Sequence, residues 1–166
     1  MNKSNPPDGI LPWTRSCFVC GEANTLGLRL RSRLEGGRVK LDYTTRQADL
    51  GYSHIVHGGI IMTLLDEVMT WSAIIGAGRM CVMAEMNTRL LNPVEVGQAL
   101  RFEGWVVRAS SRLLLTEGQV TAVASGTVMA RAEGKYLPMP KEGIRLCAQD
   151  FVASADALPI EAILKE

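Results

Sequence analysis

The sequence lacks an excess of charge of either sign. Its 18 lysines and arginines nearly cancel its 17 aspartates and glutamates, which leaves a net charge of +1 and a pI near 7.7. A nucleic-acid-binding domain usually carries a basic stripe, and a disordered chain has few hydrophobic residues. Here 47% of the 166 residues are hydrophobic. The composition therefore predicts a single folded domain that does not bind nucleic acid.

The sequence also lacks the features of a leader and of a membrane span. It starts with the polar, proline-rich segment MNKSNPPDG, in which no apolar stretch follows a charged start. Its longest uninterrupted apolar run is shorter than the roughly 20 residues of a membrane-spanning helix. We therefore expect a cytoplasmic protein that has no membrane partner.

Cysteine is scarce as well, and the residues of this type are Cys17, Cys20, Cys81 and Cys147. Without a leader, we expect free thiols rather than a disulfide framework. Cys17 and Cys20 have the spacing of metal ligands, and His54 and His57 could complete a Cys2His2 zinc site. However, His57 stands against a predicted helix start, where it has another use, and no thioredoxin-like βαβ unit follows the cysteines. We therefore expect no metal, no cofactor and no redox role.

The apolar pattern divides the chain into three parts. Residues 1–25 contain Pro6, Pro7 and Pro12 and are expected to form an irregular arm, anchored by Trp13. Residues 26–140 are expected to form the main domain. Residues 141–166 have only weak helical spacing, which predicts a tail with a short helix.

Within residues 26–140 the spacing of apolar residues changes along the chain. Alternation over 26–43, around the turn at 35–37, predicts a β-hairpin, and the long apolar segment 59–75 predicts a buried helix. Four more strands are expected at 80–91, 99–109, 112–123 and 126–137. The order ββαββββ predicts an α+β fold in which a curled, mostly antiparallel sheet wraps around one hydrophobic helix.

Two strings in this pattern resemble the hot-dog-fold acyl-CoA thioesterases. The first is HGGIIMTLLDE at 57–67, in which Asp66 stands nine residues after His57. The second, AEMNTRLLNPVEVGQAL at 84–100, is similar to the segment after the helix in the phenylacetic-acid-degradation thioesterase branch. CFVCGEANTLGLRL at 17–30 also resembles the N-terminal entry of many members. The resemblance implies a hot-dog fold and hydrolysis of an acyl-CoA thioester to a free acid and coenzyme A.

The start of the predicted helix offers a site for an oxyanion. Gly58 and Gly59 lie where the first amides of a helix have no intrahelical partner, and a ligand oxygen can approach them closely. We expect the Gly58 amide to donate to the oxyanion, Gly59 to contact the substrate, and His57 to hold the glycine loop or the thioester. The alternative is that the glycines only allow close helix packing.

Two adjacent acids interrupt the apolar helix. On a helical wheel Asp66 lies at the edge of the buried arc, where partial desolvation makes a carboxylate a stronger base. We expect Asp66 to be the general base or the nucleophile, with a solvated helix residue as the alternative. Glu67 lies on another side of the helix and is expected to be a structural or supporting acid. Thr70 is one turn after Asp66, so its hydroxyl either reaches Asp66 or bonds its own backbone.

Gly58 and Asp66 cannot act on one carbonyl within a single chain. They are eight residues apart, which is about 12 Å along a helix. The two groups must therefore come from different subunits of a two-fold dimer, as in the family that the sequence resembles. We expect a homodimer that assembles further as a dimer of dimers, and an inactive monomer.

Two positions depart from the pattern of that family. Relatives often have asparagine or glutamine six residues before the histidine, where this sequence has Gly51, and some have a serine where it has Met83. His54 is the nearest polar substitute for the first position. We therefore expect His54 to orient the thioester or the attacking water.

Coenzyme A also carries phosphates, which guanidinium groups, hydroxyls and backbone amides can hold. The expected phosphate ligands, clustered at one predicted turn, are Arg108, Ser110, Ser111 and Arg112, with Arg89 and Lys135 as weaker candidates. The alternative is that these are ordinary solvated charges of a turn.

Two other functions remain open for this sequence. A hot-dog hydratase or dehydratase would act on the acyl chain, although such enzymes usually pair an acid with a differently spaced histidine. A non-catalytic acyl-CoA-binding protein would bind the thioester without releasing a thiol. The identity of the acyl group does not follow from the sequence.

Overall fold

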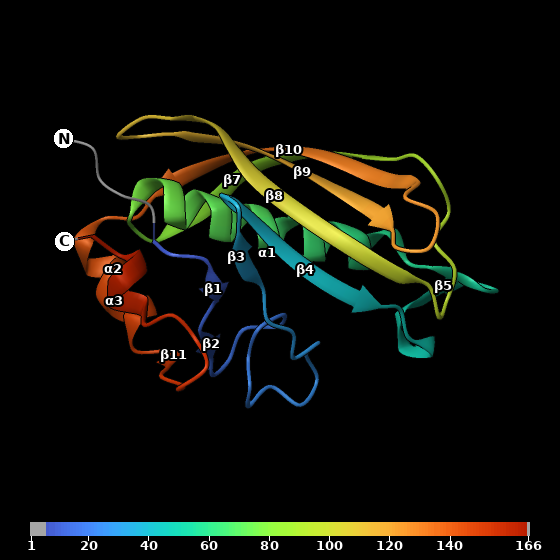
Figure 1. Cartoon of the computed structure of the whole chain (residues 1–166), viewed down its shortest axis with the longest axis horizontal. Coiled ribbons are helices and arrows are strands. Elements are labelled where there is room, and N and C mark those ends of the chain that lie inside the picture. The colour runs from blue at the N-terminus through green and yellow to red at the C-terminus, as the bar shows by residue number, and fades with distance from the viewer. Residues whose placement is uncertain (1–5, 166) are drawn as a thin grey trace.

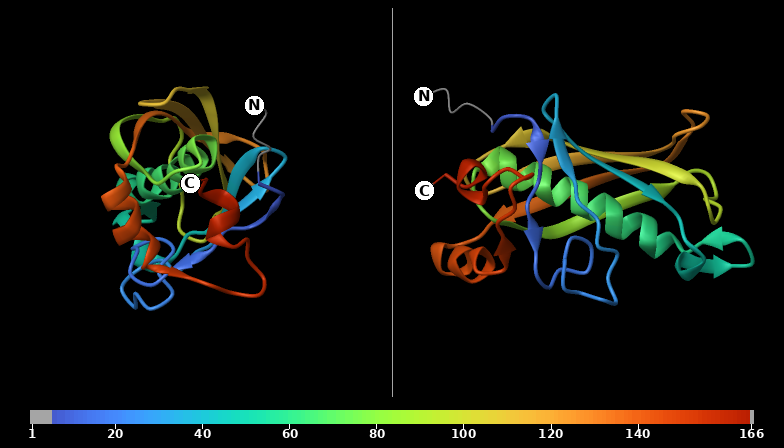
Figure 2. Two further views of the ribbon diagram at one scale, coloured as in Figure 1. Left: turned by 90° about the vertical axis from the view of Figure 1, so that its left-hand side faces the viewer. Right: turned by 60° about the horizontal axis from the view of Figure 1, so that its bottom comes forward.

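The computed structural model describes residues 6–165. A seven-stranded antiparallel sheet, in the order β1-β3-β4-β8-β9-β10-β7, is crossed on one face by the long helix α1 (Figure 1). The sheet strands are β1 (Gly9–Ile10), β3 (Arg33–Glu35), β4 (Arg38–Thr44), β7 (Cys81–Leu90), β8 (Ala99–Ala109), β9 (Leu114–Ala122) and β10 (Val128–Pro138). The end-on view shows the sheet curled around α1 (Figure 2). The expected α+β architecture is therefore confirmed.

Helix α1 (Gly58–Ala77) forms the centre of the hydrophobic core. It ends at Gly78, whose φ of 63° lets its amide reach the carbonyls of Ile74 and Ile75. By length and composition the helix could cross a bilayer, although Asp66 and Glu67 interrupt its apolar run. Most of α1 is buried within its own chain, which accounts for its composition without a bilayer.

The sheet lies close to the middle of α1 because strand residues that face this part of the helix are glycines. A Cβ at Gly104 would lie 2.6 Å from the Val68 carbonyl oxygen, and a Cβ at Gly118 would lie 2.9 Å from the Met69 sulfur. Gly104 and Gly118 are direct partners across β8 and β9. These two positions therefore set the depth at which the middle of α1 lies against the sheet.

The expected first strand of the hairpin was wrong. Residues 26–32 contain no strand, and β3 begins only at Arg33. Arg29 has a φ of 54°, which interrupts extended backbone, and the Leu28 amide donates to the Phe18 carbonyl. Leu28 and Leu30 are thus placed by hydrogen bonds to the N-terminal arm rather than by a ladder of strand hydrogen bonds, and Leu26 is exposed.

The arm and the tail contact each other and the sheet (Figure 1). In the arm, β1 pairs with β3, and β2 (Trp13–Thr14) pairs with β11 (Phe151–Val152) of the tail. The Arg31 guanidinium lies 5.0 Å from the centre of the Trp13 ring. The tail also contains α2 (Lys141–Ala148) and α3 (Ile160–Ile163). The arm is therefore held by backbone pairing as well as by Trp13.

Strand β7 is the last strand of the sheet. Among the described residues, no strand pairs with its outer edge, and most of its side chains are exposed. Its exposed hydrophobic residues include Val82, Met83 and Leu90. An unpaired strand edge with apolar side chains is a template for pairing with another chain.

Candidate functional site

A buried polar cluster positions the start of α1. Asp49, in the 3-10 helix Gln47–Asp49, accepts hydrogen bonds from the Tyr43 hydroxyl and from the backbone and side chain of Arg46. Burial raises the pKa of Asp49, but these hydrogen bonds outweigh it and hold that pKa below its usual value. The Asp49 carbonyl in turn accepts from the His57 amide at 2.8 Å. A Cβ at Gly51 would lie 3.1 Å from the His57 Cα, which leaves little room for the asparagine or glutamine of relatives.

His57 caps α1 with its ring. Its Nδ1 accepts from the Gly59 amide at 2.9 Å, and a Cβ at Gly59 would lie 2.8 Å from that nitrogen. Gly59 thus leaves space for the ring, and its amide is engaged within the chain. Over residues 6–165, the Gly58 amide has no hydrogen-bond partner. Gly58 borders a groove between the short hairpin β5 (Leu50–Tyr52), β6 (Ile55–Val56) and the end of β7, so its amide can receive a ligand oxygen.

Asp66 is half-buried on one side of α1. Its Oδ1 accepts from the Tyr136 hydroxyl at 2.8 Å and from the Thr70 hydroxyl at 3.0 Å. Burial and the charge of Asp66 raise the pKa of Tyr136 far above its usual value, so this hydroxyl remains a neutral donor. No described residue donates a hydrogen bond to the other carboxylate oxygen, Oδ2. Two donors therefore fix the carboxylate while one oxygen stays available for chemistry.

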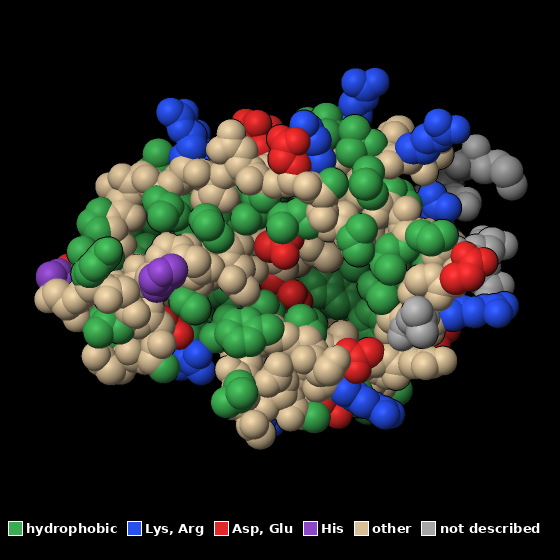
Figure 3. Space-filling model, turned by 180° about the vertical axis from the view of Figure 1, so that it is seen from behind, with side chains coloured by type: hydrophobic (Ala, Val, Ile, Leu, Met, Phe, Trp, Pro, Cys, Tyr) green, Lys and Arg blue, Asp and Glu red, His purple; other side chains and the backbone are tan. Residues whose placement is uncertain are grey.

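The face of the molecule away from the viewer of Figure 1 is hollowed near its middle. Figure 3 shows acidic side chains in this hollow, with hydrophobic side chains along its borders. A concave, mostly apolar surface with a few polar groups is typical of a ligand-binding site.

Glu67 points to a different side of α1, toward the loop that carries Cys17 and Cys20. Its Oε1 accepts from the Trp71 indole nitrogen at 3.0 Å. Burial and the neighbouring Cys17 raise the pKa of Glu67 to about 7, against the opposing effect of hydrogen bonds from Cys20 and Trp71. The hydrogen bond from Cys20 lowers the pKa of Cys17 to about 6, and the same contact raises the pKa of Cys20.

The two histidines lie apart from these cysteines. His54 is exposed at the tip of the β5–β6 hairpin, where its Nε2 lies 3.9 Å from Glu95 Oε1. Among the described residues, the only potential metal ligand that gathers with Cys17 and Cys20 is Glu67. The Cys2His2 site considered from the spacing is therefore not formed.

The expected phosphate ligands lie at the other end of α1. The Ser110 hydroxyl accepts from the Leu113 amide at 3.0 Å, and the Ser111 carbonyl accepts from Arg79, just after α1. Arg108 and Arg112 are exposed at the same turn. Because α1 is 20 residues long, this turn lies about 30 Å from Gly58. A single chain therefore does not bring the turn and the glycine amide together. Arg89 is exposed on β7, and Lys135 pairs with Glu85 at 2.8 Å.

Tyr136 is a site residue that was not expected from the sequence. Alternate residues of β10 are buried, and Tyr136 is the large polar residue of that inward set. A buried tyrosine hydroxyl usually needs a partner, so an acid on the facing helix could have been sought for it. Tyr136 also pairs with Met83 across β10 and β7, at the position where some relatives have a serine.

Replacing Tyr136 by phenylalanine tests whether it positions Asp66. We expect Tyr136→Phe to lower kcat about tenfold while KM changes little, because Asp66 loses one of two donors that fix its orientation. Steady-state kinetics of the variant and the wild type measure kcat and KM, and thermal unfolding verifies the fold. An unchanged kcat, or a rise in KM without a fall in kcat, would contradict this positioning role.

Comparisons with known proteins agree with this fold. Residues 53–129 match the profile of the thioesterase superfamily. A comparison with curated proteins gives no match. The crystal structure of a thioesterase superfamily protein is similar at a TM-score of 0.65 and 26% identity, over 74% of this chain and 60% of that one. This chain thus spans less than two thirds of that relative.

Two further structures are similar in fold. The protein smu.793 from Streptococcus mutans, bound to acetyl-CoA, has a TM-score of 0.60 and 23% identity, over 65% of this chain and 86% of that one. An acyl-CoA hydrolase from Staphylococcus aureus, in complex with butyryl-CoA and coenzyme A, has a TM-score of 0.59 and 20% identity, over 64% and 68%. Residues 53–129, which contain α1 and the strands β7 to β9, are thus similar to the thioesterase superfamily, and the curled sheet around one long helix is a hot-dog fold.

Proposed function

We propose that this protein is an acyl-CoA thioesterase that hydrolyses a thioester to a free acid and coenzyme A. The observation that carries the proposal is the Asp66 carboxylate, which Tyr136 and Thr70 hold by one oxygen while the other stays unpaired. The unpartnered Gly58 amide supplies the second requirement, a donor for the oxyanion. The acetyl-CoA and butyryl-CoA bound to two proteins of the same fold support this class of substrate.

The two groups divide the chemistry between them. If Asp66 is a base, it takes a proton from water, and the water oxygen bonds to the thioester carbonyl carbon. If Asp66 is a nucleophile, its carboxylate bonds to the carbonyl carbon, and water later hydrolyses the acyl intermediate. In both routes the carbonyl oxygen becomes an oxyanion, which the Gly58 amide stabilises by about 3 kcal/mol. The carbon–sulfur bond then breaks and the coenzyme A thiolate takes a proton.

The complete site needs two chains. Gly58 and Asp66 are about 12 Å apart on one helix, so they cannot reach one carbonyl together. The exposed edge of β7 supports a partner that pairs antiparallel with the same strand and forms a symmetric interface.

Such a pairing joins Gly58 of one chain to Asp66 of the other. A Cβ at Gly58 would lie 2.7 Å from a Leu90 side-chain carbon, so Gly58 is beside the last residue of β7. Asp66 binds Tyr136, whose strand partner is Met83, near the first residue of β7. Antiparallel pairing about the middle of β7 places Leu90 of one chain across from the region of Met83 in the other.

A panel of acyl-CoA esters tests the function. We expect release of free coenzyme A from saturated or aromatic acyl esters at least about 10³-fold faster than without protein, given an oriented carboxylate and an oxyanion donor. Coenzyme A should be separated chromatographically, because the four free cysteines of the chain would also react with a thiol reagent.

The same panel separates the other candidate functions. If the protein adds water to an enoyl-CoA ester and leaves the thioester intact, it is a hydratase. If it binds the esters tightly without release of coenzyme A, it is a binding protein. Either result would contradict the thioesterase proposal.

A further inference from the structure

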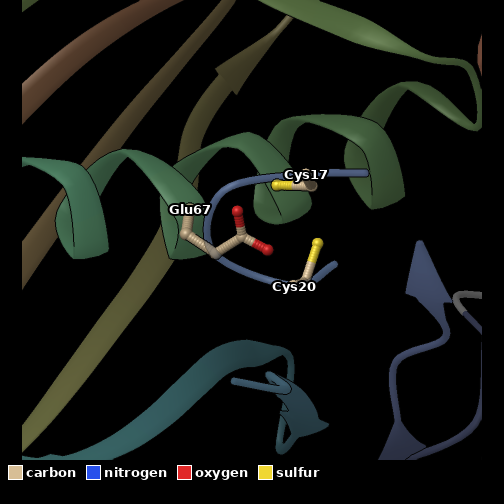
Figure 4. A group of neighbouring side chains, drawn as sticks. All are labelled: Cys17, Cys20 and Glu67. Atoms are coloured by element: carbon tan, nitrogen blue, oxygen red, sulfur yellow. The ribbon is translucent and has the colours of Figure 1, made fainter. Parts of the chain in front are cut away.

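The loop of Cys17 and Cys20 places two thiols against the carboxylate of Glu67. One ligand atom from each residue lies within 4.8 Å of the other two. Figure 4 shows both sulfur atoms and the carboxylate directed at the space between them. Cys20 is buried, whereas Cys17 and Glu67 are half-buried, so the cluster is enclosed but within reach of solvent. This set does not take part in the proposed thioester chemistry, which uses Asp66 on another side of α1.

The loop is a tight turn that directs the Val19 amide at the Cys17 sulfur. The Val19 amide donates to the Cys17 sulfur at 3.3 Å, and the Gly21 amide donates to the Cys17 carbonyl at 2.9 Å. A Cβ at Gly21 would lie 2.3 Å from that carbonyl oxygen, so only glycine allows this turn. Backbone amides directed at a sulfur stabilise a thiolate, which is the form that binds metals.

The geometry points to a zinc site formed by Cys17, Cys20 and Glu67, with one position left for water, in place of the metal-free loop expected from the sequence. Tetrahedral zinc with bonds of about 2.3 Å to sulfur holds its sulfur ligands about 3.8 Å apart, so the cluster needs only a small contraction. Two soft thiolates select zinc over magnesium or calcium. The Trp71 indole, which donates to Glu67 Oε1, fixes the orientation of the third ligand. Binding releases the thiol protons to solvent and joins the N-terminal arm to α1.

Metal uptake by the intact chain tests this site without any need for catalysis. The full-length protein is reduced, stripped with a chelator and titrated with Co²⁺ as a spectroscopic probe. We expect one equivalent per chain, with near-ultraviolet sulfur-to-cobalt absorption that added Zn²⁺ abolishes. Zinc should also raise the Tm, because it binds the folded state.

Four variants assign the ligands. Cys17→Ser and Cys20→Ser should each weaken the sulfur-to-cobalt absorption. Glu67→Gln keeps an acceptor for Trp71 but removes the anionic ligand, so zinc affinity should fall more than about tenfold, since even loss of a supporting partner costs about 10-fold or more. Cys147→Ser, on α2 and outside the cluster, is the matched thiol control and should bind as wild type does. If Cys20→Ser fails to fold, the half-buried Cys17 and Glu67 still decide the result.

Three results would overturn the site. The reduced chain could take up no metal, the absorption could persist in Cys17→Ser and Cys20→Ser, or Glu67→Gln could bind zinc as tightly as wild type. Failure here leaves the thioesterase proposal intact, since release of coenzyme A is measured separately.

Discussion

Asp66→Asn is expected to lower kcat/KM about 10²- to 10⁴-fold, because it removes the base or nucleophile. The fold should survive, since the asparagine Oδ1 can still accept from the Tyr136 and Thr70 hydroxyls. Coenzyme A release by purified variant and wild type measures the change, and circular dichroism with thermal unfolding verifies the fold.

Asp156→Asn is the matched control for this loss. Asp156 is an exposed carboxylate paired with Arg31 and far in the sequence from α1, so its amide variant should keep wild-type turnover. If Asp66→Asn retains more than about one tenth of wild-type activity, general base or nucleophilic catalysis by Asp66 is wrong.

Two inactive variants are expected to restore activity when they share a dimer. Asp66→Asn lacks the base, and Gly58→Val blocks the oxyanion donor with a β-branched side chain beside Leu90. In a mixed dimer one site receives both changes and the other receives neither. Random pairing after joint unfolding and refolding makes half the dimers mixed, which gives roughly a quarter of wild-type activity. Coenzyme A release by the refolded mixture and by each variant refolded alone measures the recovery.

A second mixture controls for the refolding itself. Wild type mixed equally with the double variant Asp66→Asn/Gly58→Val gives roughly a quarter of full activity if sites are shared, because both sites of each mixed dimer contain a change. Sites contained within one chain would give about a half. The shared site would be contradicted if the mixture of Asp66→Asn and Gly58→Val stays as inactive as each variant alone while wild type refolds normally. Gly58 and Asp66 would then act within one chain.

Much of the fold followed from the sequence, since it depends on periodicity. The apolar segment at 59–75 and the alternation in the later strands define one helix and four strands, and the structure has them within a few residues. Leu28 and Leu30 gave the same alternation, but their amides bond the loop at residues 18 and 19 instead of a strand. Whether such an alternating segment forms a strand depends on its contacts with distant segments, and local spacing does not predict those contacts.

The site followed from the sequence only where its residues share one helix. The contact of Thr70 with Asp66 comes from helical spacing, and so does the separation of Asp66 from Glu67. Tyr136 is 70 residues from Asp66, and the Cys17 loop is brought to Glu67 by the packing of the arm. Sequence spacing alone made His54 and His57 candidate metal ligands together with Cys17 and Cys20. In the fold the two histidines lie away from the two cysteines.

The long helix α1 constrains how this chain can change in evolution. It carries the Gly58 amide at its start, Asp66 on one side and Glu67 on another, while Gly104 and Gly118 fix its depth. One inserted residue between Gly59 and Asp66 would turn everything after it by about 100° and shift it by about 1.5 Å, which moves both acids away from their partners. Insertions and deletions should therefore be absent from this segment in descendants of the chain.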